Sequence, residues 1–348
     1  MAINKVFENK TIFFGMPKRY GIYKLVIKNL ELMGFKVIDI SFDDEHFSYK
    51  NFGEKLQNLI QKTFLGNKNY KQELKFQHQK NTISNRINAV NNVDFALLIR
   101  PDLYPESVIK SIKSKSKLLV GYQWDGLNVF PKVKNLIPLF DRFFVFDPQD
   151  VGVEKCLGIT NFYFNQDIFS SKKQDENLDL YFIGVYTDSR MDFILDFLRK
   201  INDCHLKIRF EIFVDNVEEV KEIHRNIPNL HYITEKISFE DAYRRGLSAK
   251  TFVDFYNPRH KGLSLRVFEA LGMHKKLITT NAEITKYDLY KPENILVYDS
   301  SITSEVLRDF LSSSIVDSDS ELIEKYSFEN WIKNVLDYKP RIENSINK

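Results

Sequence analysis

The chain has 348 residues, of which 43% are hydrophobic and 28% are charged, and its formal net charge is +3. These values exclude an intrinsically disordered chain and fit a globular protein long enough for two domains. No apolar run approaches the roughly 20 residues of a membrane span, and the first residues lack a signal-peptide layout. The two cysteines are isolated and form no metal-binding or redox spacing. The sequence therefore predicts a cytoplasmic protein, and the small net charge gives no general reason to bind polyanions.

The first half of the chain alternates between strand and helix patterns. An apolar run at 11–14 ends in Gly15, a helical pattern covers 23–33, and a strand follows at 35–40. This strand–helix–strand order predicts a parallel pair. Further strands, with helices between them, are expected at 95–99, 117–122 and 142–146.

A basic stretch lies within this half, between Lys50 and Arg86. It holds eight Lys or Arg against two Glu, a local charge of +6. Leu56, Leu59 and Ile60 stand at the spacing of an amphipathic helix. We favour a helix packed on a sheet with its basic face in solvent. The alternative is attraction to an anionic acceptor or lipid surface, through lysines such as Lys62, Lys68 and Lys71.

The second half begins after a polar spacer at 170–177 and repeats the alternating pattern. We expect strands at 180–183, 207–214, 230–233, 251–255, 277–280 and 295–298, and helices at 191–201, 217–226, 239–246, 265–273, 304–312 and 328–338. Two doubly wound domains of this kind bind ligands beyond the carboxyl ends of their strands.

The most informative segment is a polar loop, Asn257–Ser264, that runs into a helix carrying Arg266 and Glu269. Free N–H groups and the helix dipole stabilise an anion at a helix N-terminus, and an arginine fork suits phosphate. Glu269 shares a helix face with Arg266, and a carboxylate suits a sugar hydroxyl. The segment indicates a nucleotide or nucleotide-sugar site, and a surface helix with a chance salt bridge is the alternative.

The run KGLSLRVFEALGMHKKLIT, residues 261–279, resembles the C-terminal signature of the GT-B nucleotide-sugar glycosyltransferases. The resemblance implies that Glu269 holds the ribose hydroxyls and that Arg266 meets phosphate. Gly262 matches a family glycine, and Ser264 stands where a second glycine is usual. Lys261 replaces the first acid of a pair associated with retaining members, which implies an inverting enzyme.

Two further segments carry the same resemblance. In IGVYTDSR, Gly184 and Arg190 match a glycine followed by a basic residue that contacts the pyrophosphate, and family geometry puts the nucleobase near Lys236 and Ile237. The last helix resembles the family's closing helix, which often crosses back to the first domain. The resemblance thus implies two Rossmann-like domains facing a central cleft, at 1–169 and 170–326, with the closing helix and tail at 327–348.

GYQWDGLNVFP, residues 121–131, resembles a segment of the phage DNA glucosyltransferases whose aspartate is taken as the general base, which implies that role for Asp125. A carboxylate at the end of a strand is well placed to take a proton from an acceptor hydroxyl. Trp124 could desolvate it or stack on a sugar. Alternatively, Asp125 caps the turn that it forms with Gly126.

The sequence therefore predicts an inverting glycosyltransferase that moves a sugar from a nucleotide-diphosphate sugar to a glycan or lipid-linked glycan, as in lipopolysaccharide or capsule assembly. No metal and no cofactor beyond the co-substrate are expected. Gly15, Trp124 and the three lysines are assigned to the acceptor side, with possible contact to the anionic inner face of the membrane. The alternatives are a nucleotide-sugar epimerase, a DNA-modifying glucosyltransferase, for which nucleic acid would be the partner, and a non-catalytic sugar-nucleotide-binding protein.

Overall fold

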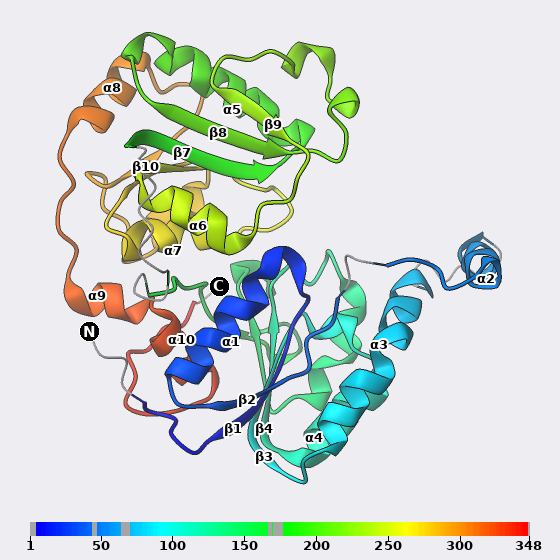
Figure 1. Ribbon diagram of the computed structural model, residues 1–348. Helices are drawn as coiled ribbons and strands as arrows, with labels where there is room; N and C mark the ends of the chain where they lie inside the picture. Colours follow the sequence, from blue (N-terminus) through cyan, green and yellow to red (C-terminus); the bar gives the residue numbers. More distant parts are fainter. Residues whose placement is uncertain (1–4, 44–46, 64–69, 166–168, 170–176, 347–348) are drawn as a thin grey trace. The chain divides into compact units, whose positions relative to one another are not determined.

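The computed structural model describes residues 5–43, 47–63, 70–165, 169 and 177–346. The chain divides into two compact units, each built on one six-stranded parallel sheet (Figure 1). The first unit comprises Met1–Ile159, Val335–Tyr338 and Ser345–Lys348, and the second comprises Thr160–Asn334 and Lys339–Asn344. Among the described helices, none combines the length and apolar character needed to cross a membrane.

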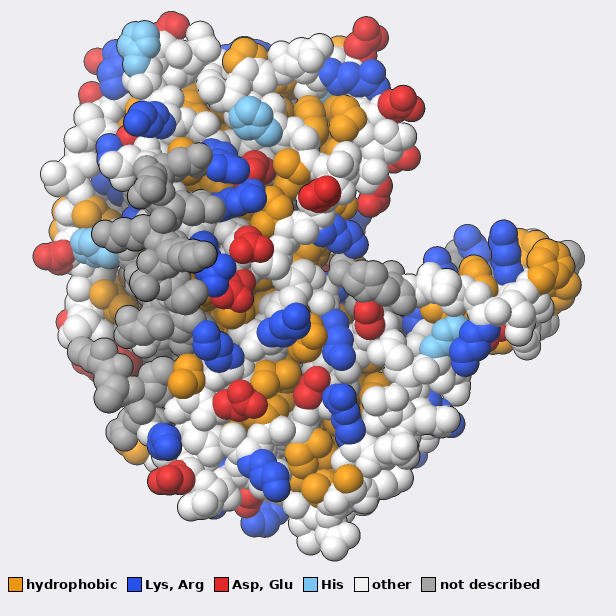
Figure 2. All heavy atoms as spheres, in the orientation of Figure 1, with side chains coloured by type: hydrophobic (Ala, Val, Ile, Leu, Met, Phe, Trp, Pro, Cys, Tyr) orange, Lys and Arg blue, Asp and Glu red, His pale blue; other side chains and the backbone are white. Residues whose placement is uncertain are grey.

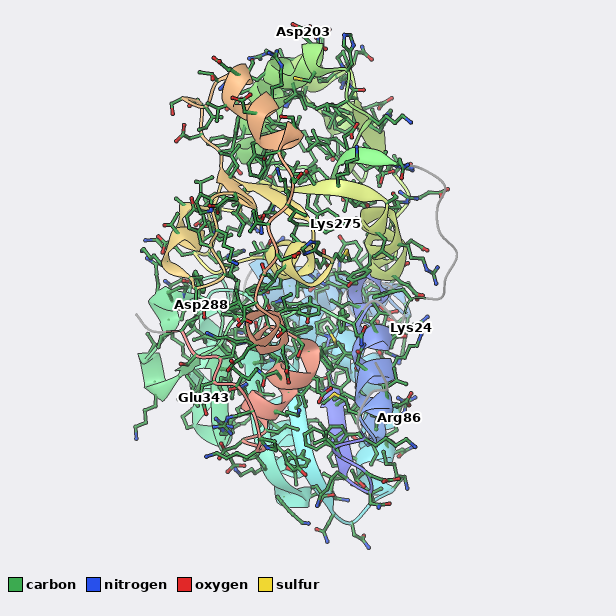
Figure 3. The ribbon with its side chains drawn as sticks, turned by 90° about the vertical axis from the view of Figure 1, so that its left-hand side faces the viewer. Lys24, Arg86, Asp203, Lys275, Asp288 and Glu343 are labelled. Carbon is green, nitrogen blue, oxygen red and sulfur yellow. The ribbon has the colours of Figure 1, made fainter. Side chains whose placement is uncertain are left out.

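The sheet of the first unit has the strand order β2-β1-β3-β4-β5-β6, with every pair parallel. Its strands are β1 (Thr11–Gly15), β2 (Lys36–Asp39), β3 (Val93–Ile99), β4 (Ser116–Gln123), β5 (Arg142–Val145) and β6 (Leu157–Gly158). The helices α1 (Ile22–Leu32), α3 (Tyr70–Asn88) and α4 (Glu106–Lys115) flank it. Arg86, near the end of α3, is labelled in Figure 3. Its side chain donates to the carbonyl oxygen of Asp39 at 2.5 Å and so ties α3 to the edge strand.

The helix α2 (Phe52–Thr63) departs from the expected packing on the sheet. None of its residues is buried, and Phe52 and Leu59 are 77% and 57% exposed. It lies beyond the end of α3, away from the sheet of its own unit (Figure 1). The expectation failed because amphipathic spacing predicts that a helix has an apolar face but not which neighbour covers that face.

The sheet of the second unit has the order β12-β11-β10-β7-β8-β9, again entirely parallel. Its strands are β7 (Leu178–Val185), β8 (Ile208–Phe213), β9 (Leu230–Ile233), β10 (Ala249–Asp254), β11 (Lys276–Thr279) and β12 (Ile295–Val297). Its helices are α5 (Asp188–Ile201), α6 (Phe239–Leu247), α7 (Leu265–Gly272), α8 (Ser304–Ser312), α9 (Ser320–Lys325) and α10 (Phe328–Val335). Apolar side chains of α5 and α8 form one core with the sheet, whereas α6 and α7 pack on its other face.

The helix expected at 217–226 does not form, and two short 3-10 turns, Val217–Glu219 and Glu222–His224, take its place. Val220, which lies between them, is extended and buried, whereas Ile223 is 74% exposed. His224 is buried and its ring contacts the hydroxyl of Tyr186 at 2.9 Å. A single helix could not place these side chains in this way, because its apolar residues would have to share one stripe.

The second unit begins at Thr160, ahead of the boundary expected at 169/170, because the segment after Thr160 packs on α10. The ring of Phe162 lies 4.8 Å from that of Trp331, and the ring of Phe164 lies 5.3 Å from that of Phe328. The indole nitrogen of Trp331 also donates to the carbonyl of Thr160 at 2.9 Å. Most of α10 therefore belongs to the second unit, whereas its last residue and the chain that follows, Val335–Tyr338, belong to the first.

Candidate functional site

The carboxyl edge of the second sheet collects most of the residues expected to bind a donor. The adjacent strands β7 and β10 both end there, and each is followed by a helix, α5 after β7 and α7 after β10. The N-termini of both helices therefore come to this edge. Helix N-termini carry unpaired N–H groups and a partial positive charge, so the edge favours an anion.

Asp254, the last residue of β10, connects neighbouring segments at this edge through hydrogen bonds. Its carboxylate accepts hydrogen bonds from Ser264 Oγ at 2.9 Å and from Thr279 Oγ1 at 3.0 Å. Ser264 is the N-cap residue of α7, but its hydroxyl donates to Asp254 and makes no capping hydrogen bond to the helix. The sequence analysis missed Asp254, although an acidic residue ending an apolar strand next to the polar loop was a usable signal.

Gly184, near the end of β7, and Arg190, in the first turn of α5, lie next to each other. A Cβ at Gly184 would stand only 2.8 Å from the ring of Phe182, so glycine leaves room for that ring, and Arg190 Nη1 would lie at an ordinary contact distance of 3.4 Å. Burial lowers the pKa of Arg190, the charge of Asp254 opposes this shift, and Arg259 adds to it. Arg190 Nε and the hydroxyl of Thr187, the N-cap of α5, are buried without a hydrogen-bond partner among the described residues.

Arg266 and Glu269, both on α7, pair with each other. Arg266 Nη1 lies 3.1 Å from Glu269 Oε2, and the side chains are only 15% and 4% exposed. The guanidinium also lies over the ring of Phe252, 5.0 Å from its centroid. Within the described part of the chain neither Nη1 nor Oε2 makes a hydrogen bond. Burial raises the pKa of Glu269 above its usual range; Arg266 opposes this shift and Asp254 adds to it.

The remaining donor-side candidates lie on loops at the same edge. Gly262 is buried and Lys261 is exposed, and the ring of His260 contacts the carbonyl oxygen of Gly262 at 3.2 Å. Lys236 and Ile237 follow β9, and the ammonium of Lys236 lies 5.9 Å from the ring centroid of Phe213, the last residue of β8.

In the first unit, Asp125 follows β4 and pairs with an arginine that the sequence analysis did not single out. Arg100 Nη1 donates to Asp125 Oδ2 at 2.5 Å, and the same guanidinium donates two hydrogen bonds of 2.8 Å to the carboxylate of Asp102. Arg100 is buried, has a left-handed φ of 60°, and lies 3.9 Å from the ring centroid of Phe130. The Asp125 side chain is 38% exposed. Neither the general-base nor the turn-cap interpretation anticipated this ion pair, because its partners are 25 residues apart.

The expected acceptor-side residues fall in three places. Trp124 is half-buried, with its ring centroid 6.5 Å from that of Tyr122. Gly15 is buried at the end of β1, where a Cβ would overlap the hydroxyl of Tyr104. The glycine therefore allows Tyr104 to pack against the strand. Lys62 and Lys71 are exposed on α2 and α3, and Lys68 lies outside the described residues.

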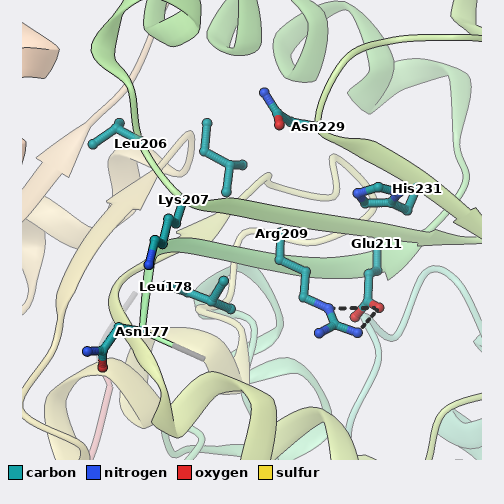
Figure 4. A pocket seen from close by; sticks show the side chains of 9 residues that line it. Asn177, Leu178, Leu206, Lys207, Arg209, Glu211, Asn229 and His231 are labelled. Carbon is teal, nitrogen blue, oxygen red and sulfur yellow. Dashed lines mark hydrogen bonds and ion pairs between the residues drawn. The ribbon is translucent and has the colours of Figure 1, made fainter. Parts of the chain in front are cut away.

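A shallow hollow in the second unit lies at the opposite, amino edge of β7 and β8 (Figure 4). Glu211 is buried between Arg209 and Arg245, with Arg245 Nη1 2.7 Å from both of its oxygens. None of the expected site residues lines this hollow. Ligands of parallel sheets bind at carboxyl edges, so the geometry favours the edge around Asp254 as the site.

No family model and no curated protein matches the chain. The chain is nevertheless similar to solved structures over most of its length. An alpha-glucosyltransferase in complex with UDP and a 13-mer DNA containing an HMU base is 12% identical with a TM-score of 0.52, covering 86% of this chain and 89% of that one. An alpha,alpha-trehalose-phosphate synthase (UDP-forming) from Burkholderia vietnamiensis is 10% identical, also with a TM-score of 0.52, covering 88% of this chain and 92% of that one.

Such low identities bear on the fold alone, and the fold agrees with the expectation. The two parallel six-stranded sheets of this chain are matched by those structures over most of both chains. The chain has the GT-B fold.

Proposed function

We propose that the protein is a glycosyltransferase that uses a nucleotide-diphosphate sugar as donor. The observation that carries the proposal is the meeting, at the Asp254 edge, of Thr187 Oγ1 and Arg190 Nε, buried without hydrogen-bond partners among the described residues, with the buried ion pair of Arg266 and Glu269. A buried polar atom costs about 1–3 kcal/mol when left unpaired, so Thr187 Oγ1 and Arg190 Nε favour a ligand that supplies the missing partners. Phosphate oxygens and ribose hydroxyls are partners of the right kind.

The donor would be held by both helix N-termini. Arg190 and Thr187 would meet the diphosphate at the start of α5, with Ser264, Lys261 and Gly262 at the start of α7. Glu269 would accept hydrogen bonds from the ribose hydroxyls. Arg266, which is engaged by Glu269, would position that carboxylate and add positive charge.

The nucleobase would lie near Lys236 and Ile237. Two structural neighbours support a uridine nucleotide as the first donor to test, since one was solved with UDP and the other is named UDP-forming.

The transfer itself would be inverting and would need no metal. The acceptor oxygen forms a bond to the anomeric carbon while the bond from that carbon to the diphosphate oxygen breaks. The acceptor proton passes to the carboxylate of Asp125, and the diphosphate leaves with the bonding electrons, stabilised by Arg190. The ion pair with Arg100 supports this role by fixing one oxygen of Asp125, and the 38% exposure of the side chain leaves it open to an acceptor.

The proposed acceptor is a glycan or lipid-linked glycan, with Trp124 and the exposed lysines Lys62 and Lys71, together with Lys68, on the acceptor side. A DNA acceptor is the second candidate, because one structural neighbour was solved with DNA. A nucleotide-sugar epimerase or a non-catalytic binding protein would use the same donor groups without transfer. Product analysis separates them: an epimerase changes the donor without any acceptor, and a binding protein leaves it intact.

The test begins with thermal shifts in the presence of UDP, GDP, CMP and TDP sugars. We expect one of them to raise the Tm of the wild-type protein, with the shift lost in Arg190→Gln and kept in Arg199→Gln, which alters an exposed arginine on the same helix. Mass spectrometry with candidate acceptors then identifies the product. A crystal soak that places the nucleotide away from Arg190 and Glu269 would overturn the donor site.

A further inference from the structure

The helix α2 (Phe52–Thr63) is turned the opposite way from an ordinary surface helix. At 100° per residue, its four large apolar side chains fall within an arc of about 100°. All four are exposed: Phe52 by 77%, Leu56 by 45%, Leu59 by 57% and Ile60 by 40%. The half-buried positions of the helix are instead polar, Glu54, Asn58 and Gln61, and they lie on the opposite side. The polar face is therefore the one turned toward the protein.

Polar contacts hold the helix in this orientation. Glu54 accepts from the backbone N–H of Lys50 at 2.9 Å and pairs with His78 of α3 at 3.0 Å. Asn58 Nδ2 donates to the hydroxyl of Tyr49 at 2.9 Å. At the start of the helix, Asn51 Oδ1 accepts from the N–H of Glu54 at 3.0 Å, as an N-cap does. The outward direction of the apolar face is thus fixed by specific bonds.

The charges on the helix are sorted in the same way. Its single acid, Glu54, is on the inward side, whereas Lys55 and Lys62 are exposed and border the apolar arc. Hydrophobic and basic side chains accordingly gather over α2 in the surface view (Figure 2). An apolar stripe bordered by lysines, with no acid beside it, is the pattern of helices that lie in the headgroup region of an anionic bilayer. There the lysine stems pack along the apolar surface while their ammonium groups reach the phosphates.

We propose that α2 docks the protein on the surface of an anionic lipid bilayer, with Phe52, Leu56, Leu59 and Ile60 inserted among the lipids and Lys55 and Lys62 on the headgroups. Charge favours this occupant over a second copy of the chain, which would bring the lysines against each other. Size favours it as well, because a stable protein interface takes about 20–30 residues a side, far more than one helix face presents.

The proposal is tested by co-sedimentation with vesicles of phosphatidylcholine, with and without phosphatidylglycerol. We expect binding only when phosphatidylglycerol is present. Leu59→Glu should weaken it at least tenfold, whereas Gln57→Glu, which adds the same charge at an exposed polar position of the same helix, should weaken it far less. Replacing Lys55 and Lys62 by Gln should cost roughly fivefold each, because a basic residue near such a surface is worth about 1 kcal/mol. None of these side chains is buried, so the circular dichroism spectrum and Tm should stay unchanged.

Three results would overturn the proposal: no binding to the anionic vesicles, equal losses in Leu59→Glu and Gln57→Glu, or lipid-free dimers that dissociate in Leu59→Glu. The last would assign the apolar face to a second copy, and analytical ultracentrifugation detects it. The vesicle assay contains no sugar nucleotide, so its outcome is independent of the proposed glycosyl transfer.

Discussion

At the residue scale, Glu269 makes the donor proposal testable through pH. Burial raises its pKa above the usual range, so in the free protein the neutral form is favoured to a higher pH than in an ordinary glutamate. The stability linked to this proton is present at low pH and is lost as pH rises through the raised pKa. Ribose hydroxyls donate to the ionised form, so ligand binding should release the proton.

We therefore expect the affinity for the nucleotide sugar to fall as pH drops through the pKa of Glu269, which burial raises above the usual value of about 4.3. Titration calorimetry measures it, with a diphosphate sugar whose phosphates do not titrate in that range. Glu269→Gln should bind about 1–3 kcal/mol more weakly and lose this pH dependence. A parallel decline in both proteins would mean that Glu269 does not contact the ligand.

Asp125 carries the mechanistic prediction. General-base catalysis typically contributes about 10²–10⁴-fold, so Asp125→Asn should lower kcat by that factor and leave donor affinity unchanged. The amide can still accept from Arg100, so the fold should survive, and Tm is the control. If the ion pair with Arg100 is the only role of Asp125, the variant should lose Tm but little turnover. NMR of the product's anomeric centre gives a separate check, since retained donor stereochemistry contradicts an inverting step.

At the scale of elements, α10 fixes the start of the second unit through Trp331. This side chain is fully buried, donates to the carbonyl of Thr160, and contacts the ring of Phe162. Trp331→Ala should lower the free energy of unfolding by about 3–5 kcal/mol, the cost of a large cavity. Trp331→Phe keeps most of the volume but loses the hydrogen bond, so about 1–3 kcal/mol is expected.

Urea denaturation followed by circular dichroism measures both variants of Trp331. A change within about 0.5 kcal/mol in Trp331→Ala, as for an ordinary surface substitution, would show that α10 does not hold the 160–164 segment.

At the scale of the whole molecule, each of the two units has an aspartate at the amino end of its sheet that makes the same two kinds of contact. Asp94 of β3 accepts from the N–H of Thr11 at 3.0 Å and pairs with Lys117 at 2.8 Å. Asp179 of β7 accepts from the N–H of Lys207 at 2.9 Å and pairs with Lys250 at 2.8 Å. Each carboxylate thereby links its strand to the strands on both sides.

Burial by itself would raise the pKa of Asp94 and Asp179, but the hydrogen bonds and lysine charges outweigh it and lower both values. A lowered pKa contributes stability above the unfolded value, and this stability is lost as pH falls through the folded one. We therefore expect Tm to decline below about pH 4.

The double variant Asp94→Asn, Asp179→Asn should start from a lower Tm and decline less steeply over the same range. Asp192→Asn, at an exposed position on α5, is the control and should follow the wild-type curve. Equal slopes in all three proteins would contradict the prediction. Thermal melts across pH measure it.

The sequence by itself determined what depends on near neighbours along the chain. Apolar runs and helical periodicity predicted most strands and helices, because a strand or helix is recognised within a window of a few residues. The loop before Arg266, the helix that carries Glu269, and the turn that brings Gly184 to Arg190 are also local features, so the sequence could single out these residues as candidates. The 217–226 segment failed because the burial of His224 against Tyr186 outweighs a weak helical pattern.

Only the tertiary structure decided what depends on residues distant in sequence. The ion pair of Arg100 with Asp125 joins residues from two strand ends, and the bonds of Asp254 to Ser264 and Thr279 join three separate segments. The orientation of α2 was decided in the same way. Its periodicity gave two faces, and tertiary contacts such as that of Glu54 with His78 of α3 turn the polar face inward. Which face of a helix is buried depends on the partner that the fold supplies, and the pattern of that helix alone does not contain this partner.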